Sequence, residues 1–248
     1  MNENKGYVLI VGAKSDIAQA LAREYAENGY YLYLAARGDK KELEGIASDI
    51  KIRYNVKTEC CFLDILDFAS HQKFYEQLNP KPIGVVVAVG YLGDQKEAQN
   101  SFDETHCIID TNYTGCVSLL NIVANDLEKR KEGFIVGISS VAGERGRKNN
   151  YLYGSAKAAL SAYLSGLRQR LFKAGVQVLT VKPGFVNTKM TKRMDLPKKL
   201  TAQPEEVAAD ILRAQQKGRD IICSKRLWRY IMFFIKLMPE KYFKRANF

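Results

Sequence analysis

Two residues that can share a proton stand four positions apart in this chain. In the stretch SSVAGERGRKNNYLYGSAKAAL, Tyr153 precedes Lys157 at the start of a segment with helical periodicity, so both side chains fall on one helix face, one turn apart. A phenol with a pKa of about 10 is a weak acid at neutral pH, and a nearby ammonium group favours its ionised form. The pair predicts a tyrosine that transfers a proton with the help of a lysine.

Three further features surround this pair. Ser140 ends the apolar run FIVGIS, where its hydroxyl is placed to bond the same carbonyl oxygen that Tyr153 would protonate. Tyr151 has a serine rather than a lysine four positions later, which indicates packing or a pocket wall. Arg145, Arg147 and Lys148 lie in the loop between Ser140 and Tyr153. They form either a solvated loop or a site for a substrate phosphate, which suits the forked guanidinium group.

The elements that must position these residues alternate along the chain. Helix-like segments separate the apolar runs, a pattern typical of a parallel sheet covered on both faces. Helices are predicted from about residue 154 to 174, with Gly175 as a stop, and over 204–216, followed by a short strand, DIICS. The sequence predicts a doubly wound parallel α/β sheet of the Rossmann type. The six main predicted strands are residues 7–11, 31–36, 60–63, 85–89, 134–138 and 176–181.

A glycine turn follows the first predicted strand. Gly12 stands where the chain leaves the strand, and the next helix offers its free N–H groups to a pyrophosphate. Usual dinucleotide turns carry two more glycines, whose places are taken here by Asp16 and Ala18. Asp16 can cap the helix instead, and Lys14 can offset its charge. The residues predicted to bind the cofactor here are Gly12, Lys14, Ser15, Asp16 and Ile17.

Arg37 is predicted to select the cofactor. It follows the second strand, where an acid binds the ribose hydroxyls of NAD and an arginine binds the 2′-phosphate of NADP. Lys40 and Lys41 leave a surface arginine in a basic loop as the alternative. Asp64, at the end of the third strand, is expected either to bond the adenine ring together with the backbone of Ile65 or to cap a turn. NADP(H) is therefore the expected cofactor.

The positive charge of the chain is concentrated at its C-terminal end. Net charge is +11, and from Ile221 onward seven basic residues face one acid, so 7 − 1 = +6 of it lies there. Residues 1–224 are predicted to form the catalytic domain and residues 225–248 a basic amphipathic segment. The run LWRYIMFFIKLM is too short to span a bilayer. The spacing of Leu227, Tyr230, Ile231 and Phe234 indicates packing on the core or on a second subunit, whereas the flanking cations indicate an interfacial segment attracted to anionic lipid.

Several classes of protein are disfavoured by composition. The five cysteines lack metal-ligand spacing and the chain has two histidines, so no metal site is expected. The N-terminus places acid and base before an apolar run that continues into a glycine turn, unlike a signal peptide or a membrane span. No motif supports nucleic-acid binding. A cytoplasmic protein is expected.

Together these motifs resemble the short-chain dehydrogenase/reductase family over nearly the whole chain. The resemblance rests on NYTG with Asn112, SSVAG with Ser140, YGSAK with Tyr153 and Lys157, and KPGFVNT after the sixth strand. It implies that Asn112 holds a water in a proton relay to Lys157 and that Lys157 also bonds the nicotinamide ribose. Further cofactor contacts are implied for Gly90, Pro183, Gly184, Val186 and Thr188.

Departures from the usual family motifs resemble one branch. VAVG stands where the family has NNAG, and the glycine turn reads GAKSDIA. These changes, with YLGDQKEAQ, NYTGCVSL, AGERGRK and the tail, are similar to the decaprenylphosphoryl-2-keto-β-D-erythro-pentose reductases, the reductase subunits of decaprenylphosphoryl-ribose 2-epimerase.

That branch implies an NADPH-dependent ketoreductase that converts a polyprenyl-phosphate-linked 2-keto-pentofuranose to its arabinose epimer for a cell-envelope polysaccharide. It implies a flavin-dependent partner oxidase, a homodimer or homotetramer, and a peripheral position at an anionic surface, the inner face of the cytoplasmic membrane. Two alternatives stay open. One is a reductase of another lipophilic ketone, such as a long-chain 3-keto compound, and the other is a non-catalytic dinucleotide-binding regulator.

Overall fold

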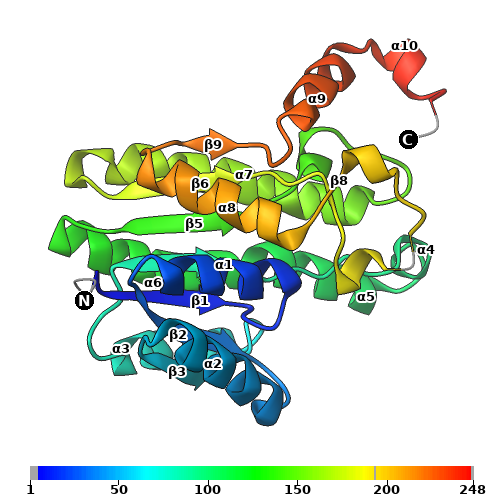
Figure 1. Cartoon of the computed structure of the whole chain (residues 1–248). Coiled ribbons are helices and arrows are strands. Elements are labelled where there is room, and N and C mark those ends of the chain that lie inside the picture. The colour runs from blue at the N-terminus through cyan, green and yellow to red at the C-terminus, as the bar shows by residue number, and fades with distance from the viewer. Residues whose placement is uncertain (1–4, 193, 247–248) are drawn as a thin grey trace.

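A computed structural model describes residues 5–192 and 194–246 of the chain (Figure 1). Within them, seven parallel strands form one sheet in the order β3-β2-β1-β4-β5-β6-β9. The chain order reverses between β1 and β4, which is the arrangement of a doubly wound fold, so the predicted fold class is confirmed. The strands are β1 Tyr7–Val11, β2 Tyr31–Ala36, β3 Thr58–Phe62, β4 Gly84–Val87, β5 Phe134–Ile138, β6 Gln177–Val181 and β9 Ile221–Ile222; β7 Phe185–Val186 and β8 Thr201–Ala202 pair separately.

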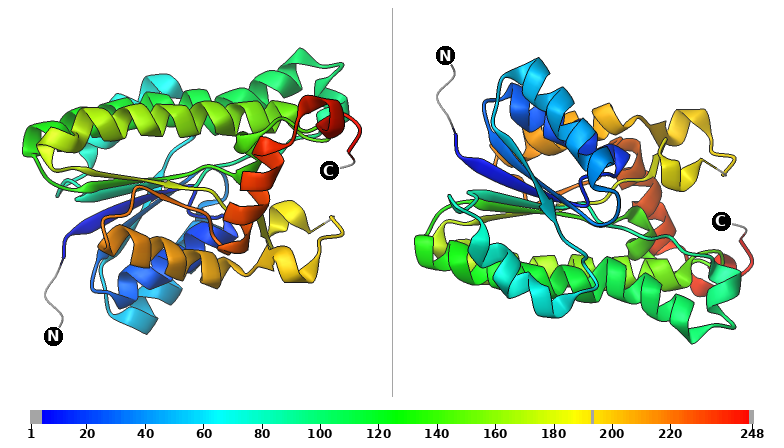
Figure 2. Two further views of the ribbon diagram at one scale, coloured as in Figure 1. Left: turned by 90° about the horizontal axis from the view of Figure 1, so that it is seen from above. Right: turned by 90° about the horizontal axis from the view of Figure 1, so that it is seen from below.

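Helices cover both faces of this sheet (Figure 2). One face packs against α1, α2 and α8 and the other against α3, α6 and α7, with a hydrophobic cluster on each side. Because β1, β4 and β5 are fully buried between these layers, they read as continuous apolar runs in the sequence. The helices are α1 Asp16–Glu27, α2 Lys40–Tyr54, α3 His71–Gln77, α4 Gln95–Ala98, α5 Phe102–Ile109, α6 Gly115–Arg130, α7 Tyr151–Leu171, α8 Pro204–Gln216, α9 Leu227–Leu237 and α10 Glu240–Phe243.

The helix that carries the tyrosine and lysine begins earlier than expected. α7 starts at Tyr151 rather than near residue 154, and Gly175 follows its last 3-10 turn in a left-handed conformation, with φ of 72°. Its leucines at positions 160, 164, 167 and 171 are buried against the sheet, as their spacing predicts. Tyr153 therefore lies in the first turn of a long, firmly packed helix.

A long apolar helical stretch runs from α5 into α6. Phe102–Arg130 is 29 residues long and apolar enough by composition to cross a bilayer, but half of its most apolar window is buried inside the protein. Burial of Leu119, Leu120 and Val123 in the cluster on the sheet explains this composition, as is common for a core helix.

The C-terminal segment packs on the rest of the chain through a face that differs from the predicted one. Trp228, Met232 and Ile235 are the buried residues of α9, whereas Leu227, Tyr230 and Phe234 are 51%, 63% and 68% exposed. Of the open alternatives, packing on the core is therefore excluded for these three side chains, whereas a second subunit and a lipid surface are not tested. Of the predicted group, Ile231 alone packs on the core cluster that contains Trp228. The outer ends of the two predicted segments, residues 1–4 and 247–248, lie outside the described part of the chain.

Trp228 determines which face turns inward. Its indole covers Gly184 so closely that a Cβ there would lie 1.9 Å from the indole nitrogen. The indole N–H donates to the Leu200 carbonyl at 2.9 Å, and the ring meets Phe185 edge-on. A large ring with a satisfied polar atom is a strong anchor, so α9 is held at the carboxyl ends of the strands.

Replacement of Trp228 by alanine tests this anchor. Loss of a buried indole costs about 3 kcal/mol, so the free energy of opening of α9, measured by native-state hydrogen exchange of its amides, should fall by that amount. Phe233→Ala is the matched control because Phe233 is 59% exposed and should change the value by less than about 0.5 kcal/mol. An unchanged opening energy in Trp228→Ala would show that other contacts hold the helix.

Candidate active site

A cavity of about 290 Å³ opens at the carboxyl ends of β1, β4, β5 and β6. Ligands bind at this edge in open α/β sheets, where the strand order reverses. The lining brings together most of the residues singled out by sequence: Ser15, Asp16, Ile17, Gly90, Ser140, Arg147, Tyr153, Lys157, Pro183, Gly184, Val186 and Thr188. Leu92, Phe185, Met190 and Met194 also line it, and nothing in their spacing identified them beforehand.

Ser140 and Tyr153 meet at the floor of this cavity. Ser140 follows β5 in an extended conformation, and its Oγ accepts from the Ala142 N–H at 3.1 Å. Ser140 and Tyr153 both line the cavity, and the serine hydroxyl acts to lower the pKa of Tyr153. Two glycines allow the loop to reach the helix. A Cβ on Gly143 would lie 2.7 Å from the Ala158 nitrogen, and one on Gly154 would lie 2.9 Å from the Ala142 oxygen. The serine and the tyrosine are thus brought together by direct contact of two backbones.

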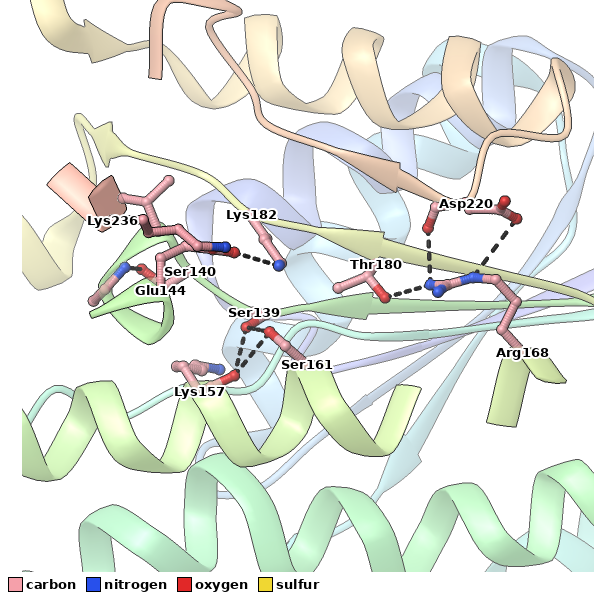
Figure 3. A network of polar contacts seen from close by, with 12 residues as sticks. Ser139, Ser140, Glu144, Lys157, Ser161, Arg168, Thr180, Lys182, Asp220 and Lys236 are labelled. Carbon is pink, nitrogen blue, oxygen red and sulfur yellow. Dashed lines mark hydrogen bonds and ion pairs between the residues drawn. The ribbon is translucent and has the colours of Figure 1, made fainter. Parts of the chain in front are cut away.

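Lys157 is buried one turn beyond Tyr153. The residue is 2% exposed, and its Nζ donates to the carbonyl oxygens of Ile138 at 3.1 Å and Val89 at 3.3 Å. The ammonium lies 5.8 Å from the centre of the Tyr153 ring. Ser139, which follows β5, is tied to α7 at the same position, since its Oγ donates to the Lys157 carbonyl at 2.8 Å (Figure 3).

Burial shifts both proton-exchanging groups toward their neutral forms. Loss of solvation lowers the pKa of Lys157 to about 8. It raises the pKa of Tyr153 to about 12, although the hydrogen bond from Ser140 acts in the opposite direction. The lower pKa that the neighbouring lysine predicts for Tyr153 is therefore not found, because burial disfavours the ionised phenol and raises its pKa.

Asn112 lies on an irregular turn that the sequence did not reveal. Residues Asp110–Thr114 form a π-helix between α5 and α6, a feature common at functional sites. The Asn112 amide donates to the carbonyls of Tyr91 at 2.6 Å and Ile108 at 2.8 Å and accepts from the Tyr91 N–H at 3.2 Å. These bonds hold the loop after β4, including Gly90, beside Lys157. The water relay implied by the resemblance stays a proposal.

The turn after β1 requires glycine at position 12. Gly12 has a φ of 83°, and a Cβ there would lie 2.9 Å from the Val89 nitrogen, so both conformation and space require glycine. Ser15, not Asp16, is the N-cap of α1, with its Oγ accepting from the Ala18 N–H at 3.2 Å. The capping interpretation of Asp16 is wrong because the residue before it already occupies the cap.

The Asp16 carboxylate instead reaches across to the segment after β7. It accepts from the Lys189 N–H at 2.6 Å, so part of its charge is taken up away from the turn. A second, more open hollow of about 370 Å³ lies on the outer side of this contact, lined by Arg23 and Lys192 among others. It contains none of the proton-exchanging residues and is not the centre of the site.

The tip of β2 is basic, as expected. Arg37 lies 3.5 Å from the Asp64 carboxylate and its side chain is 54% exposed, so it is free to swing toward a ligand. Lys14 bonds the Asp39 carbonyl at 2.5 Å and pairs with Glu42 at 3.2 Å. Asp64 caps its own turn by accepting from the Leu66 N–H at 3.0 Å, which matches the capping alternative, while Ile65 is buried.

Comparison with known proteins agrees with this geometry. Residues 6–199 match the family model described as short chain dehydrogenase. An uncharacterized oxidoreductase of Mycobacterium tuberculosis is 36% identical over 241 residues, covering 96% of both chains, and one of Streptomyces coelicolor is 30% identical over 243 residues, covering 96% of this chain and 94% of the other.

The chain belongs to the short-chain dehydrogenase family. Among solved structures, a short-chain dehydrogenase from Sphingobium yanoikuyae in complex with NADPH has a TM-score of 0.82 at 22% identity, covering 95% of this chain and 97% of the other. At that identity the likeness concerns the fold. The family assignment establishes an oxidoreductase. It does not identify the substrate, which must be inferred from the residues that distinguish this short-chain dehydrogenase from its relatives.

The basic loop of this short-chain dehydrogenase divides into two parts. Arg145 turns away from the cavity and donates to the carbonyls of Ile235 at 2.5 Å and Met238 at 2.6 Å. It also pairs with Glu240 at 2.8 Å and lies 3.7 Å over the Phe243 ring. The expectation that Arg145 binds a substrate phosphate is therefore corrected, because its guanidinium caps the C-terminal end of α9.

Arg147 is the basic residue of this loop that lines the cavity. Burial lowers its pKa, and it donates to the Val141 carbonyl at 3.4 Å, while its Nε is buried without a partner among the described residues. Lys148 and Tyr151 are exposed and stand outside the cavity lining. Of the four residues expected to bind substrate, Arg147 is the one whose side chain reaches the cavity.

Glu144 links the catalytic loop to the C-terminal helix, a role that the sequence did not indicate. It is 13% exposed and pairs with Lys182 and, at 2.8 Å, with Lys236 of α9 (Figure 3). Burial acts to raise the pKa of Glu144, but the two lysines lower it overall. The loop that follows Ser140 is thus tied to the segment before Pro183 and to α9.

The pKa of Lys157 predicts a pH limit for this short-chain dehydrogenase. Above about pH 8 the free enzyme loses the ammonium that stabilises an ionised tyrosine, so kcat/KM for carbonyl reduction should fall about tenfold per pH unit. Tyr153 stays protonated through this range because its pKa is about 12. The measurement is kcat/KM from about pH 6 to about pH 10, and a profile that stays flat to the upper limit would contradict it.

Proposed function

We propose that this chain is an NADPH-dependent ketoreductase in which Tyr153 donates a proton to the carbonyl oxygen of the substrate. The observation that carries the proposal is the meeting of Tyr153, Ser140 and the buried Lys157 in one cavity at the carboxyl edge of the sheet. A non-catalytic dinucleotide binder has no need for a buried ammonium beside a tyrosine, so the regulator alternative is disfavoured.

The chain fits a dinucleotide phosphate along one side of the cavity. Ser15, Asp16 and Ile17 at the N-terminus of α1 line the cavity, where the free backbone N–H groups of a helix start suit a pyrophosphate. Arg37 and Lys14 lie at the tip of β2, where a 2′-phosphate would need cationic partners. The Sphingobium relative bound to NADPH supports this choice. The bound cofactor would supply the hydride.

The residues of the chain would move the proton. Tyr153 is neutral at physiological pH because burial keeps its pKa near 12, so it holds a proton to give. Ser140 orients the hydroxyl and bonds the same carbonyl oxygen. Lys157, charged below about pH 8, stabilises the phenolate that remains after the transfer.

The proposed substrate is a polyprenyl-phosphate-linked 2-keto-pentofuranose, produced by a flavin-dependent partner oxidase and reduced to the arabinose epimer. Arg147 supports it, since a half-buried guanidinium in the cavity suits a phosphate. The apolar walls of Phe185, Met190 and Met194 support a lipid-linked molecule and equally favour the second candidate, another lipophilic ketone such as a long-chain 3-keto compound. A homodimer or homotetramer, as the resemblance implies, belongs to the same proposal.

Oxidation of NADPH by wild type and Tyr153→Phe tests the chemistry and the substrate together. With keto-pentose polyprenyl phosphate formed in place by a flavin oxidase, kcat should fall by a factor of about 10²–10⁴ in the variant, while NADPH binding stays intact. Tyr151→Phe is the control and should keep wild-type turnover, because Tyr151 does not line the cavity. Turnover of a long-chain 3-keto compound alone would select the second candidate, and NADPH binding with no turnover of either would overturn the enzymatic proposal.

A charge reversal at Arg37 tests the cofactor. Arg37→Asp should raise the KM for NADPH by at least about tenfold, since a hydrogen bond to a charged group is lost, and should lower the KM for NADH. Lys40→Asp makes the same charge change three residues later, at the start of α2 and at a side chain that is 82% exposed, and should leave the preference alone. If the two variants change the KM values for NADPH and NADH alike, the general positive charge of this region rather than Arg37 governs the cofactor preference.

A further inference from the structure

The C-terminal helix α9 has a second apolar face that is mostly exposed. Leu227, Tyr230, Phe233, Phe234 and Leu237 are all more than half exposed, at 51%, 63%, 59%, 68% and 64%. Their spacing of three and four residues gathers them into one stripe, the outer stripe, opposite the buried residues of the helix. A contiguous exposed patch of large apolar side chains is unusual for a soluble surface and marks an interaction site.

Exposed cations flank the outer stripe along the chain. Arg226 precedes α9, Arg229 lies in its first turn, and Lys241, Lys244 and Arg245 belong to the segment around α10. Lys198 and Lys199 are exposed in the adjoining segment, which Trp228 contacts through the Leu200 carbonyl. The one acid of the tail, Glu240, is already paired with Arg145. The surface is therefore apolar at its centre and positive at its margin.

This charge pattern distinguishes between possible occupants. A second copy of the chain related by a two-fold axis would set the same cations against one another, which disfavours self-association through this face. An anionic bilayer accepts both parts of the surface, since aromatic and aliphatic side chains enter the interface and cations meet the headgroups. With 11 residues, α9 is too short to span and long enough to lie in the interface.

We propose that the outer stripe of α9 docks the protein on an anionic lipid bilayer. The inner face of the same helix covers Gly184 and Phe185 of the cavity wall. Met190 and Met194, which line the cavity, are themselves 44% and 45% exposed. Figures 1 and 2 show α9 and the segments 189–192 and 194–200 at the same end of the sheet. Docking would therefore hold the cavity next to the membrane surface, whichever lipophilic ketone is reduced.

The experiment is co-sedimentation of the full chain with vesicles. Wild type should bind vesicles that contain about one third phosphatidylglycerol, bind neutral phosphatidylcholine vesicles at least about tenfold more weakly, and lose affinity as salt is raised. Phe233→Ser with Phe234→Ser should weaken binding at least about tenfold, because both rings would enter the interface. Phe172→Ser is the matched control, since Phe172 is 80% exposed and lies after α7, outside the tail.

Trp228 reports whether α9 stays folded in these variants. It is the one tryptophan of the chain and is buried on the inner face, so unchanged emission of the double variant shows that the helix is still in place. Equal binding by the double variant and wild type, or equal binding to neutral and anionic vesicles, would overturn the proposal. Self-association that depends on Phe233 and Phe234, measured by sedimentation velocity without lipid, would assign the outer stripe to a second copy instead.

Discussion

Burial of the Lys157 ammonium is the constraint on which the rest of the site depends. A lysine that is 2% exposed loses most of its solvation, and a buried charge is costly unless polar groups compensate it. Here the compensation comes from the carbonyls of Ile138, the last residue of β5, and Val89, two residues after the end of the neighbouring β4. Their positions follow from the pairing of β4 with β5. Gly143 and Gly154 then let the loop after β5 contact α7 closely enough for Ser140 to reach Tyr153.

The C-terminal helix completes this arrangement from the other side of the cavity. Lys236 pairs with Glu144 of the catalytic loop, Arg145 of that loop caps the helix, and Trp228 covers Gly184. One helix therefore holds the loop that carries Ser140 and the turn that begins with Pro183. A division of the chain at residue 224 describes its composition well, but these contacts make the tail a structural part of the site.

The sequence was most informative where local pattern determines the structure. Parallel strands buried on both faces read as apolar runs, so the sheet was predictable, and the spacing of Tyr153 and Lys157 placed them on one helix face. The details that were missed depend on distant neighbours. Asp16 is the first residue of α1 after the Ser15 cap, and its carboxylate bonds Lys189, which is 173 residues away. Arg145 serves α9, 90 residues later, and α9 turns Trp228 inward because Gly184 leaves space for an indole. No local periodicity contains that information.

The opposite pKa shifts of Tyr153 and Lys157 explain how one environment serves both groups. Burial favours the neutral phenol, which is the form that can donate a proton, and disfavours the ammonium, which is the form that stabilises the product phenolate. An anionic ligand in the cavity favours the charged lysine and so raises its pKa. By linkage, such a ligand binds more tightly when Lys157 is protonated. Binding of an anionic ligand therefore favours the protonated Lys157 that the chemical step requires. Without a ligand, the same ammonium is poorly solvated.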